Sequence, residues 1–209
     1  MARGLFVTFE GPEGSGKSTQ VKLLATALAN KTIPYVTTRE PGGTETADAL
    51  RSILLSRATG DLSPRAELLM LQAARADHVC KVIKPGLDAG KIVICDRFTD
   101  SSIAYQGGGR GLDKSFIQEL NDFATENLRP DLTLIFDIDP EEGLKRAGRQ
   151  GALQLDRVES AGLEFHTRVR DAYLILAQDQ PTRYHLIDAT RSVEEIAEDV
   201  ASTILARWE

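Results

Sequence analysis

The sequence has little cysteine, because its 209 residues include only Cys80 and Cys95. These two form no CxxC pair and no Cys/His spacing typical of a metal site. A disulfide framework and a structural zinc site are therefore not expected. Both residues are predicted to be reduced, inert thiols.

Long apolar runs are also lacking. The opening run, residues 5–7, is soon followed by Glu10, which makes it too short for the apolar core of a secretory signal. No stretch approaches the roughly 18 apolar residues that cross a bilayer. These absences predict a cytoplasmic protein without a membrane partner.

An excess of positive charge is missing as well. Lys and Arg total 25 against 31 Asp and Glu, which gives a net charge of −6. Such a balance argues against sequence-independent nucleic-acid binding, because that needs a basic surface to neutralise phosphates. Hydrophobic residues make up 42% and charged residues 27%, as in an ordinary globular chain. We expect a single domain over residues 1–209, and any phosphate recognition must be local.

Five short runs rich in β-branched or aromatic residues alternate with longer segments of helical periodicity, the pattern of an α/β protein with a parallel sheet. The runs cover residues 5–9, 35–38, 92–95, 132–138 and 184–187. Helices are expected to start near Lys17, Glu45, Pro64, Asp113, Pro140, Leu163 and Val193. Three glycine-containing stretches, residues 40–44, 106–111 and 150–155, are predicted as loops that could face a ligand.

The strongest motif is GPEGSGKS at residues 11–18, which matches GxxxxGK(S/T) between the first predicted strand and helix. In this pattern backbone N–H groups converge on phosphate, Lys17 reaches the β and γ oxygens, and Ser18 can ligate Mg²⁺. A glycine-rich turn without a ligand is the alternative. A dinucleotide site would need glycine at Thr19. The residues expected to bind the phosphates of a nucleotide, which the resemblance described below implies is ATP, are Gly11, Pro12, Glu13, Gly14, Ser15, Gly16, Lys17, Ser18 and Thr19.

Polar residues also follow two other predicted strands. Asp96 and Arg97 end the third run, at the sheet edge where open α/β proteins bind ligands. Asp96 can hold a magnesium-bound water, and Arg97 offers a two-pronged donor for phosphate oxygens. A strand-end salt bridge is the alternative. Arg39 ends the second run in the same way, and Arg51 follows about two turns into the next helix.

Several segments together resemble the bacterial thymidylate kinase family, in the same order and over almost the whole chain. They are the glycine-rich loop with the preceding Glu10, residues 38–44 (TREPGGT), 73–75 (AAR), 96–98 (DRF), 101–102 (SS), 104–110 (AYQGGGR), 130–134 (PDLTL) and 156–159 (DRVE). The resemblance implies a P-loop NTPase fold with a five-stranded parallel sheet flanked by helices and a short mobile lid near residues 144–158. It also implies transfer of the γ-phosphoryl group of ATP to dTMP for dTTP synthesis, and a homodimer formed by helices within residues 45–89.

The resemblance implies roles for individual residues. Arg97 and Arg39 would grip the dTMP phosphate, with Arg51 near the same loop. Arg75 would donate to a thymine carbonyl, and Ser102 and Gln106 would also contact the base. Tyr105 would lie under the deoxyribose, where a ribose 2′-hydroxyl would clash, and Glu13 would meet the 3′-hydroxyl. The alternatives without a role in ligand binding are a solvated helix residue for Arg75, a core ring for Tyr105 and a turn residue for Gln106.

Two positions bear on which variant of the thymidylate kinase site this chain carries. Some family members carry an arginine at the position of Gly14, whereas others place the transition-state arginine in the lid. Because this chain has Gly14, Arg146 and Arg149 are the candidate catalytic lid arginines, followed by Arg157; a solvated basic face paired with Glu141 or Glu142 is the alternative. The family usually stacks thymine on a phenylalanine one turn before the base-reading arginine, and Leu71 stands there.

Other functions stay open at this stage. Another P-loop nucleoside or nucleotide kinase is one, although the TREPGG and AYQGGGRG segments speak against it. A P-loop regulator that binds ATP without transferring phosphate is the other. His78, His166 and His185 occur in no catalytic or ligand spacing and are expected to be core or surface imidazoles.

Overall fold

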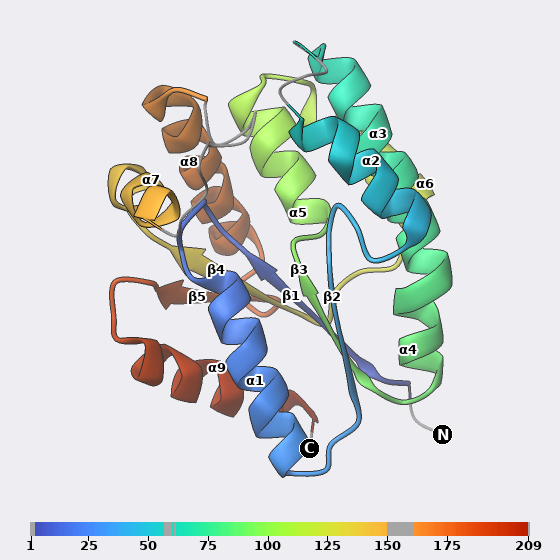
Figure 1. Ribbon diagram of the computed structural model, residues 1–209, viewed down its shortest axis with the longest axis vertical. Helices are drawn as coiled ribbons and strands as arrows, with labels where there is room; N and C mark the ends of the chain where they lie inside the picture. The colour runs from blue at the N-terminus through green and yellow to red at the C-terminus, as the bar shows by residue number, and fades with distance from the viewer. Residues whose placement is uncertain (1–2, 57–59, 61, 150–160, 209) are drawn as a thin grey trace.

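The computed structural model describes residues 3–56, 60, 62–149 and 161–208. Within them lies a five-stranded parallel sheet in the order β2-β3-β1-β4-β5 (Figure 1). Its strands are β1 (Leu5–Glu10), β2 (Tyr35–Arg39), β3 (Ile92–Asp96), β4 (Leu132–Asp137) and β5 (Tyr184–Asp188). The five predicted strands are confirmed, each to within one residue at its carboxyl end.

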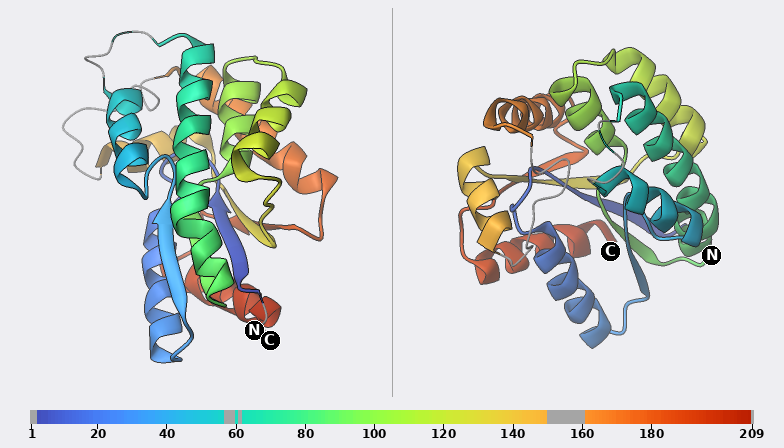
Figure 2. Two further views of the ribbon diagram at one scale, coloured as in Figure 1. Left: turned by 90° about the vertical axis from the view of Figure 1, so that its right-hand side faces the viewer. Right: turned by 45° about the horizontal axis from the view of Figure 1, so that its top comes forward.

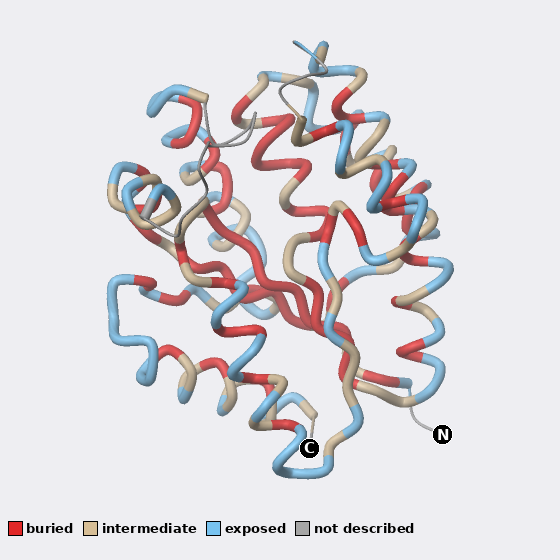
Figure 3. The backbone as a smooth tube through the Cα atoms, in the orientation of Figure 1, coloured by how far each residue is buried: buried red, intermediate tan, exposed pale blue. Residues whose placement is uncertain are grey.

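Helices cover both faces of the sheet, as Figure 2 shows in two further views. One face packs on α1 (Lys17–Asn30) and α9 (Val193–Trp208). The other packs on α8 (Leu163–Asp179), on a π-helical turn, Val79–Ile83, and on α4 (Lys84–Asp88). The π-helical turn and α4 continue α3 (Pro64–His78). Coverage on both faces explains why the strand sequences are mostly apolar, and Figure 3 shows the residues of the central strands as buried.

The remaining described helices are α2 (Glu45–Leu55), α5 (Thr99–Ser102), α6 (Lys114–Thr125) and α7 (Pro140–Arg149). The predicted helix starts are confirmed: Asp113 is the N-cap of α6, and its carboxylate accepts from the N–H groups of Ser115 and Phe116. The described helices include none that is long and apolar enough to cross a bilayer.

The predicted loop at residues 106–111 is wrong for most of its length. A π-helix, Ile103–Gly109, follows α5 directly, and the N–H of Arg110 donates to the carbonyl of Tyr105 at 2.9 Å. Three consecutive glycines suggested a loop, but here they let this helix approach α8. A Cβ on Gly108 would lie 2.8 Å from the Cβ of Ala172. Tyr105 and Gln106 therefore project from a helix rather than a turn.

The strand order brings the segments that carry the predicted site residues to one edge of the sheet. β1 lies between β3 and β4, and the segments after β1, β2 and β3 all begin at the carboxyl edge of the sheet. The chain leaves β1 for α1 on one face and leaves β3 for α5 on the other, so the sheet has a topological switch point there. In open α/β sheets this is where ligands bind.

Candidate active site

Two adjoining pockets open at this edge of the sheet. One is lined by the glycine-rich loop together with Arg39, Asp96 and Ala147 of α7. The other is lined mainly by α3, the π-helix and the end of α2, with Leu71, Arg75, Ser102, Tyr105 and Gln106 in its wall. Four residues, Glu13, Glu40, Arg51 and Arg97, line both pockets. The structure thus brings the predicted ATP site and the predicted dTMP site against each other.

The glycine-rich loop leads directly into α1. Gly16 is the N-cap, and no side chain of the described residues caps this helix end, so its first N–H groups face the pocket as in phosphate-binding helices. The buried ammonium of Lys17 donates to Pro12 O at 2.8 Å, Gly11 O at 3.1 Å and Ser15 Oγ at 3.1 Å. Burial, with the nearby charge of Arg97, lowers the pKa of Lys17 to about 8.

Ser18 and Asp96 form the oxygen pair expected for magnesium. The hydroxyl of Ser18 donates to Asp96 Oδ2 at 2.6 Å, although 78 residues separate them in sequence. Within the described residues no group of three or more His, Cys, Asp or Glu could hold a metal. Mg²⁺ is usually held by one or two protein oxygens plus phosphate and water. A hydroxyl and a carboxylate beside a phosphate-binding loop fit that requirement.

Arg97 lies at the junction of the pockets. Its Nη2 donates to Glu13 Oε1 at 2.8 Å, and its guanidinium lies 4.9 Å from the ring centroid of Tyr105. The Tyr105 hydroxyl also donates to Glu13 Oε1, at 2.9 Å. Burial opposes ionisation of Glu13, but the charges of Arg97 and Lys17 lower its pKa to about 2. Arg97 itself has a positive φ of 72°, an uncommon backbone conformation that clusters at functional sites.

Arg75 is buried rather than solvated, with 2% of its side chain exposed. Its Nε donates to Glu40 Oε2 at 2.8 Å, and Nη1 contacts Gln72, Ser102 and Asn121 at 2.8–3.0 Å. The alternative of a solvated helix residue is therefore wrong. Leu71, one turn earlier, lines the same pocket.

The polar residues of the π-helix also face this pocket. Gln106 Nε2 donates to the buried Glu67 Oε1 at 2.6 Å, which fixes the amide with its oxygen available as an acceptor. Because Gln106 lies on a helix, the alternative of a turn residue is wrong. Tyr105 is both a pocket residue and part of an apolar cluster with Phe165 and Tyr173.

The two other arginines predicted to bind the dTMP phosphate, Arg51 and Arg39, differ in their position relative to the pockets. Arg51 Nη1 donates to Pro41 O at 2.9 Å, and Arg51 lines both pockets. Arg39 lines only the pocket of the glycine-rich loop, and its half-exposed guanidinium lies 3.4 Å from Asp48. The structure therefore brings Arg51 closer to the junction than Arg39.

Helix α7 lies over the glycine-rich loop. A Cβ on Gly14 would overlap the carbonyl oxygen of Gly143, so α7 approaches the loop more closely than a side chain at position 14 would allow. Arg146 pairs with Glu142 at 3.0 Å and donates to Ala189 O at 2.9 Å, so the ion-paired alternative holds for this residue. Arg149 ends α7; Arg157 and residues 150–158 of the predicted lid lie outside the described residues.

Several buried polar residues at the site, among them Glu10, Glu67 and His78, had no role assigned from the sequence. Glu10, at the end of β1, accepts hydrogen bonds from the Phe98 N–H, the Ser101 hydroxyl and the Tyr173 hydroxyl at 2.6–2.8 Å. Glu67 orients Gln106, and His78 contacts Glu40. Their partners are 38 to 163 residues away in sequence, so no local pattern signals them.

Comparison with known proteins agrees with this site. Residues 9–200 match the family model for thymidylate kinase. The chain is 49% identical to the thymidylate kinase of Geotalea uraniireducens over 98% of both chains, and 47% identical to that of Symbiobacterium thermophilum over 94% of this chain and 90% of the relative. It also superposes on the crystal structure of thymidylate kinase from Ehrlichia chaffeensis with a TM-score of 0.79, at 38% identity over 97% of this chain and 99% of that one. Sequence, fold and pockets agree, and the chain belongs to the thymidylate kinase family.

Proposed function

We propose that the two adjoining pockets carry out the phosphorylation of dTMP to dTDP, with ATP phosphates at the glycine-rich loop and dTMP beside α3 and the π-helix. The observation that carries this arrangement is the sharing of Glu13, Glu40, Arg51 and Arg97 by both pockets. Phosphoryl transfer needs positioning and charge neutralisation more than covalent catalysis. Lysine and arginine side chains at the junction supply both.

At the ATP side, the Lys17 ammonium would exchange its loop oxygens for the β and γ phosphate oxygens. Arg97 would bind the dTMP phosphate from the other side and offset the repulsion between the negatively charged phosphates of the two substrates. Ser18 and Asp96 would hold Mg²⁺, which neutralises phosphate charge when bound. Arg51, and Arg39 after release from Asp48, would complete the phosphate contacts.

At the dTMP side, Gln106 Oε1 would accept from the N3–H of thymine, because Glu67 already holds the amide nitrogen. Ser102 and Arg75 would contact the base edge, and Leu71 would cover its face. Tyr105 would lie beneath the deoxyribose, with its hydroxyl fixed by Glu13. Glu13 would accept from the 3′-hydroxyl.

We also propose that the chain folds as one domain, that α7 begins a lid extending to about residue 158, and that two copies form a homodimer. Support for the dimer comes from apolar side chains exposed on α2, α3 and α6. These are Ile53 at 41%, Leu69 at 57%, Phe116 at 55% and Phe123 at 86% exposure. Helix α3 packs against both α2 and α6, and contiguous exposed apolar surface is typical of interaction sites.

A coupled assay of ADP release with a panel of nucleoside monophosphates tests the substrate assignment. We expect turnover with dTMP and dUMP, little with dCMP because its unprotonated N3 offers no hydrogen to Gln106, and little with UMP because its 2′-hydroxyl meets Tyr105. Tyr105→Ala should relax the discrimination between dUMP and UMP. Equal kcat/KM for dUMP and UMP in the unmodified enzyme would contradict the role of Tyr105.

A further inference from the structure

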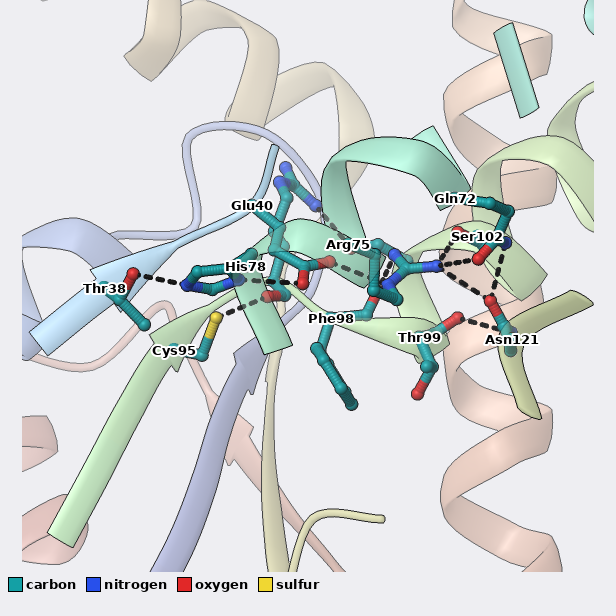
Figure 4. A network of polar contacts seen from close by, with 12 residues as sticks. Thr38, Glu40, Gln72, Arg75, His78, Cys95, Phe98, Thr99, Ser102 and Asn121 are labelled. Atoms are coloured by element: carbon teal, nitrogen blue, oxygen red, sulfur yellow. Dashed lines mark hydrogen bonds and ion pairs between the residues drawn. The ribbon is translucent and has the colours of Figure 1, made fainter. Parts of the chain in front are cut away.

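His78 lies at the end of α3 and is fully buried, with 0% exposed, behind the dTMP pocket. Figure 4 shows it between β2 and the segment that follows. Its Nε2 lies 2.6 Å from Thr38 Oγ1 and its Nδ1 lies 3.0 Å from Glu40 Oε1. Thus both ring nitrogens contact the strand and loop that carry Arg39 and Glu40.

The two contacts assign a direction to each hydrogen bond. An ionised carboxylate only accepts, so the proton facing Glu40 belongs to Nδ1. In that tautomer of the neutral ring, Nε2 accepts the hydroxyl proton of Thr38. A single arrangement of the imidazole therefore satisfies both partners.

The orientation that His78 gives to the Glu40 carboxylate also determines how Glu40 contacts Arg75. While Oε1 faces His78, the other oxygen, Oε2, accepts from Arg75 Nε at 2.8 Å. The Arg75 side chain is 2% exposed and that of Glu40 5%, so an altered carboxylate orientation would leave a buried charge poorly paired. Beyond Arg75 the network reaches Ser102 Oγ at 3.0 Å, in the wall of the dTMP pocket.

The loop at residues 40–44 is built around the same imidazole. Gly43 has a φ of 89°, and a Cβ on it would lie 2.6 Å from Thr38 Oγ1 and 2.7 Å from His78 Cδ2. The hydroxyl of Thr44 donates to Asp77, the neighbour of His78, at 2.6 Å. Earlier in the same loop, Pro41 O accepts a hydrogen bond from Arg51 Nη1. The end of α3 therefore holds the loop that contacts Arg51.

We propose that His78 is a positioning residue for dTMP: it orients Glu40 so that Arg75 is held for the base, and it anchors the loop that holds Arg51 for the phosphate. This inference rests on the proposed assignment of Arg75 and Arg51 to the dTMP pocket. His78 itself lines neither pocket and acts through Glu40, which lines both.

Two substitutions separate this role from simple packing. In His78→Asn the amide nitrogen takes the place of Nδ1 and keeps the donor to Glu40. In His78→Gln the amide reaches the place of Nε2, so the contact with Thr38 is kept and the donor to Glu40 is lost. We expect His78→Gln to raise the KM for dTMP about tenfold, as for a lost hydrogen bond to a charged group, and His78→Asn to stay within about threefold of the unmodified enzyme. The KM for ATP should change in neither.

A packing role predicts the opposite order, because asparagine leaves the larger void. Equal effects of the two variants, a larger effect of His78→Asn, or a parallel rise in the KM for ATP would overturn the inference. If His78→Gln does not fold, Thr38→Val removes the hydroxyl donor to Nε2 with little change of shape. A rise of a few-fold in the KM for dTMP alone supports the inference, and an unchanged KM contradicts it.

Arg75→Ala and a double variant complete the experiment. Arg75→Ala must raise the KM for dTMP; if it does not, the pocket assignment fails, independently of His78. In the Glu40→Gln background, His78→Gln should add little, because the interaction it removes is already altered. Full additivity of the two substitutions would show that His78 does not act through Glu40.

Discussion

Leu71 lines the proposed dTMP pocket from α3, where the resemblance to thymidylate kinases leads us to expect a phenylalanine. An aromatic face offers a stacked contact worth about 0.5–1.5 kcal/mol beyond the burial of area. Leucine offers only dispersion and apolar cover. We therefore expect Leu71 to hold the base less firmly than a phenylalanine would.

We expect Leu71→Phe to tighten dTMP binding a few-fold, and about tenfold at most, while leaving ATP binding unchanged. Calorimetric titration of dTMP against both proteins measures the effect, with Arg75→Ala as a control for a lost base contact. If phenylalanine brings no gain while Arg75→Ala weakens binding, Leu71 does not cover the base and a neighbour such as Met70 takes that place.

At the scale of elements, Glu10 joins the end of β1 to the start of α5. It is 0% exposed, and burial together with the Asp100 carboxylate raises its pKa to about 7, against the lowering effects of Ser101, Arg97 and Tyr173. Between pH 4.5 and about 7 the folded state therefore binds more protons at this site than the unfolded state. Stability from Glu10 is full below pH 4.5 and is lost as pH rises through 7.

The difference between 4.5 and about 7 corresponds to roughly 3 kcal/mol at most. Denaturant unfolding at pH 5.5 and pH 8 should show the unmodified protein losing stability relative to Glu10→Gln, whose amide does not titrate. Parallel pH dependence of the two proteins, or a gain of the unmodified protein at pH 8, would show that Glu10 is already ionised at pH 5.5.

Helix α7 contains both candidate catalytic arginines, Arg146 and Arg149. Arg146 is bound to Glu142 and Ala189 O, so Arg149 is the first candidate for the arginine that stabilises charge in the transition state. Arg149→Ala should lower kcat more than it weakens ATP binding, as expected for a group that acts mainly in the transition state. Arg146→Ala is the matched comparison. If both variants keep the unmodified kcat, the catalytic arginine is not in this helix.

The helices and strands differ in how well the sequence alone predicts them. Strand ends and helix starts follow from periodicity, proline and caps, which are local signals. The π-helix over Ile103–Gly109 was missed because three glycines normally signal a loop, and its cause is the close packing of α8. The glycine-rich loop could be predicted because its eight residues are consecutive in the sequence. The hydrogen-bond network around His78 could not, because it depends on contacts that α3 makes with β2 and with Glu40 after it.

At the scale of the whole molecule, the sheet order decides which motifs meet. Placing β1 between β3 and β4 brings Ser18 to Asp96 and Glu13 to Arg97. Individual strand sequences contain no signal for that order. Strand-end position and the glycine-rich motif could place these residues at one edge of the sheet, but not pair them. The fold thus brings separate strand-end polar residues together in one site with two adjoining pockets.

The central claim is that this site moves the γ-phosphoryl group of ATP directly to dTMP. Single-turnover reaction of γ-labelled ATP with dTMP tests it, in the unmodified enzyme, in Lys17→Met and in Lys22→Met, which alters an exposed residue of α1. We predict labelled dTDP from the unmodified enzyme and Lys22→Met. Lys17→Met should still bind dTMP but form dTDP slower by orders of magnitude, because a charge that meets the transferring group is lost. Comparable rates in Lys17→Met, or label released as inorganic phosphate with dTMP unchanged, would contradict the account.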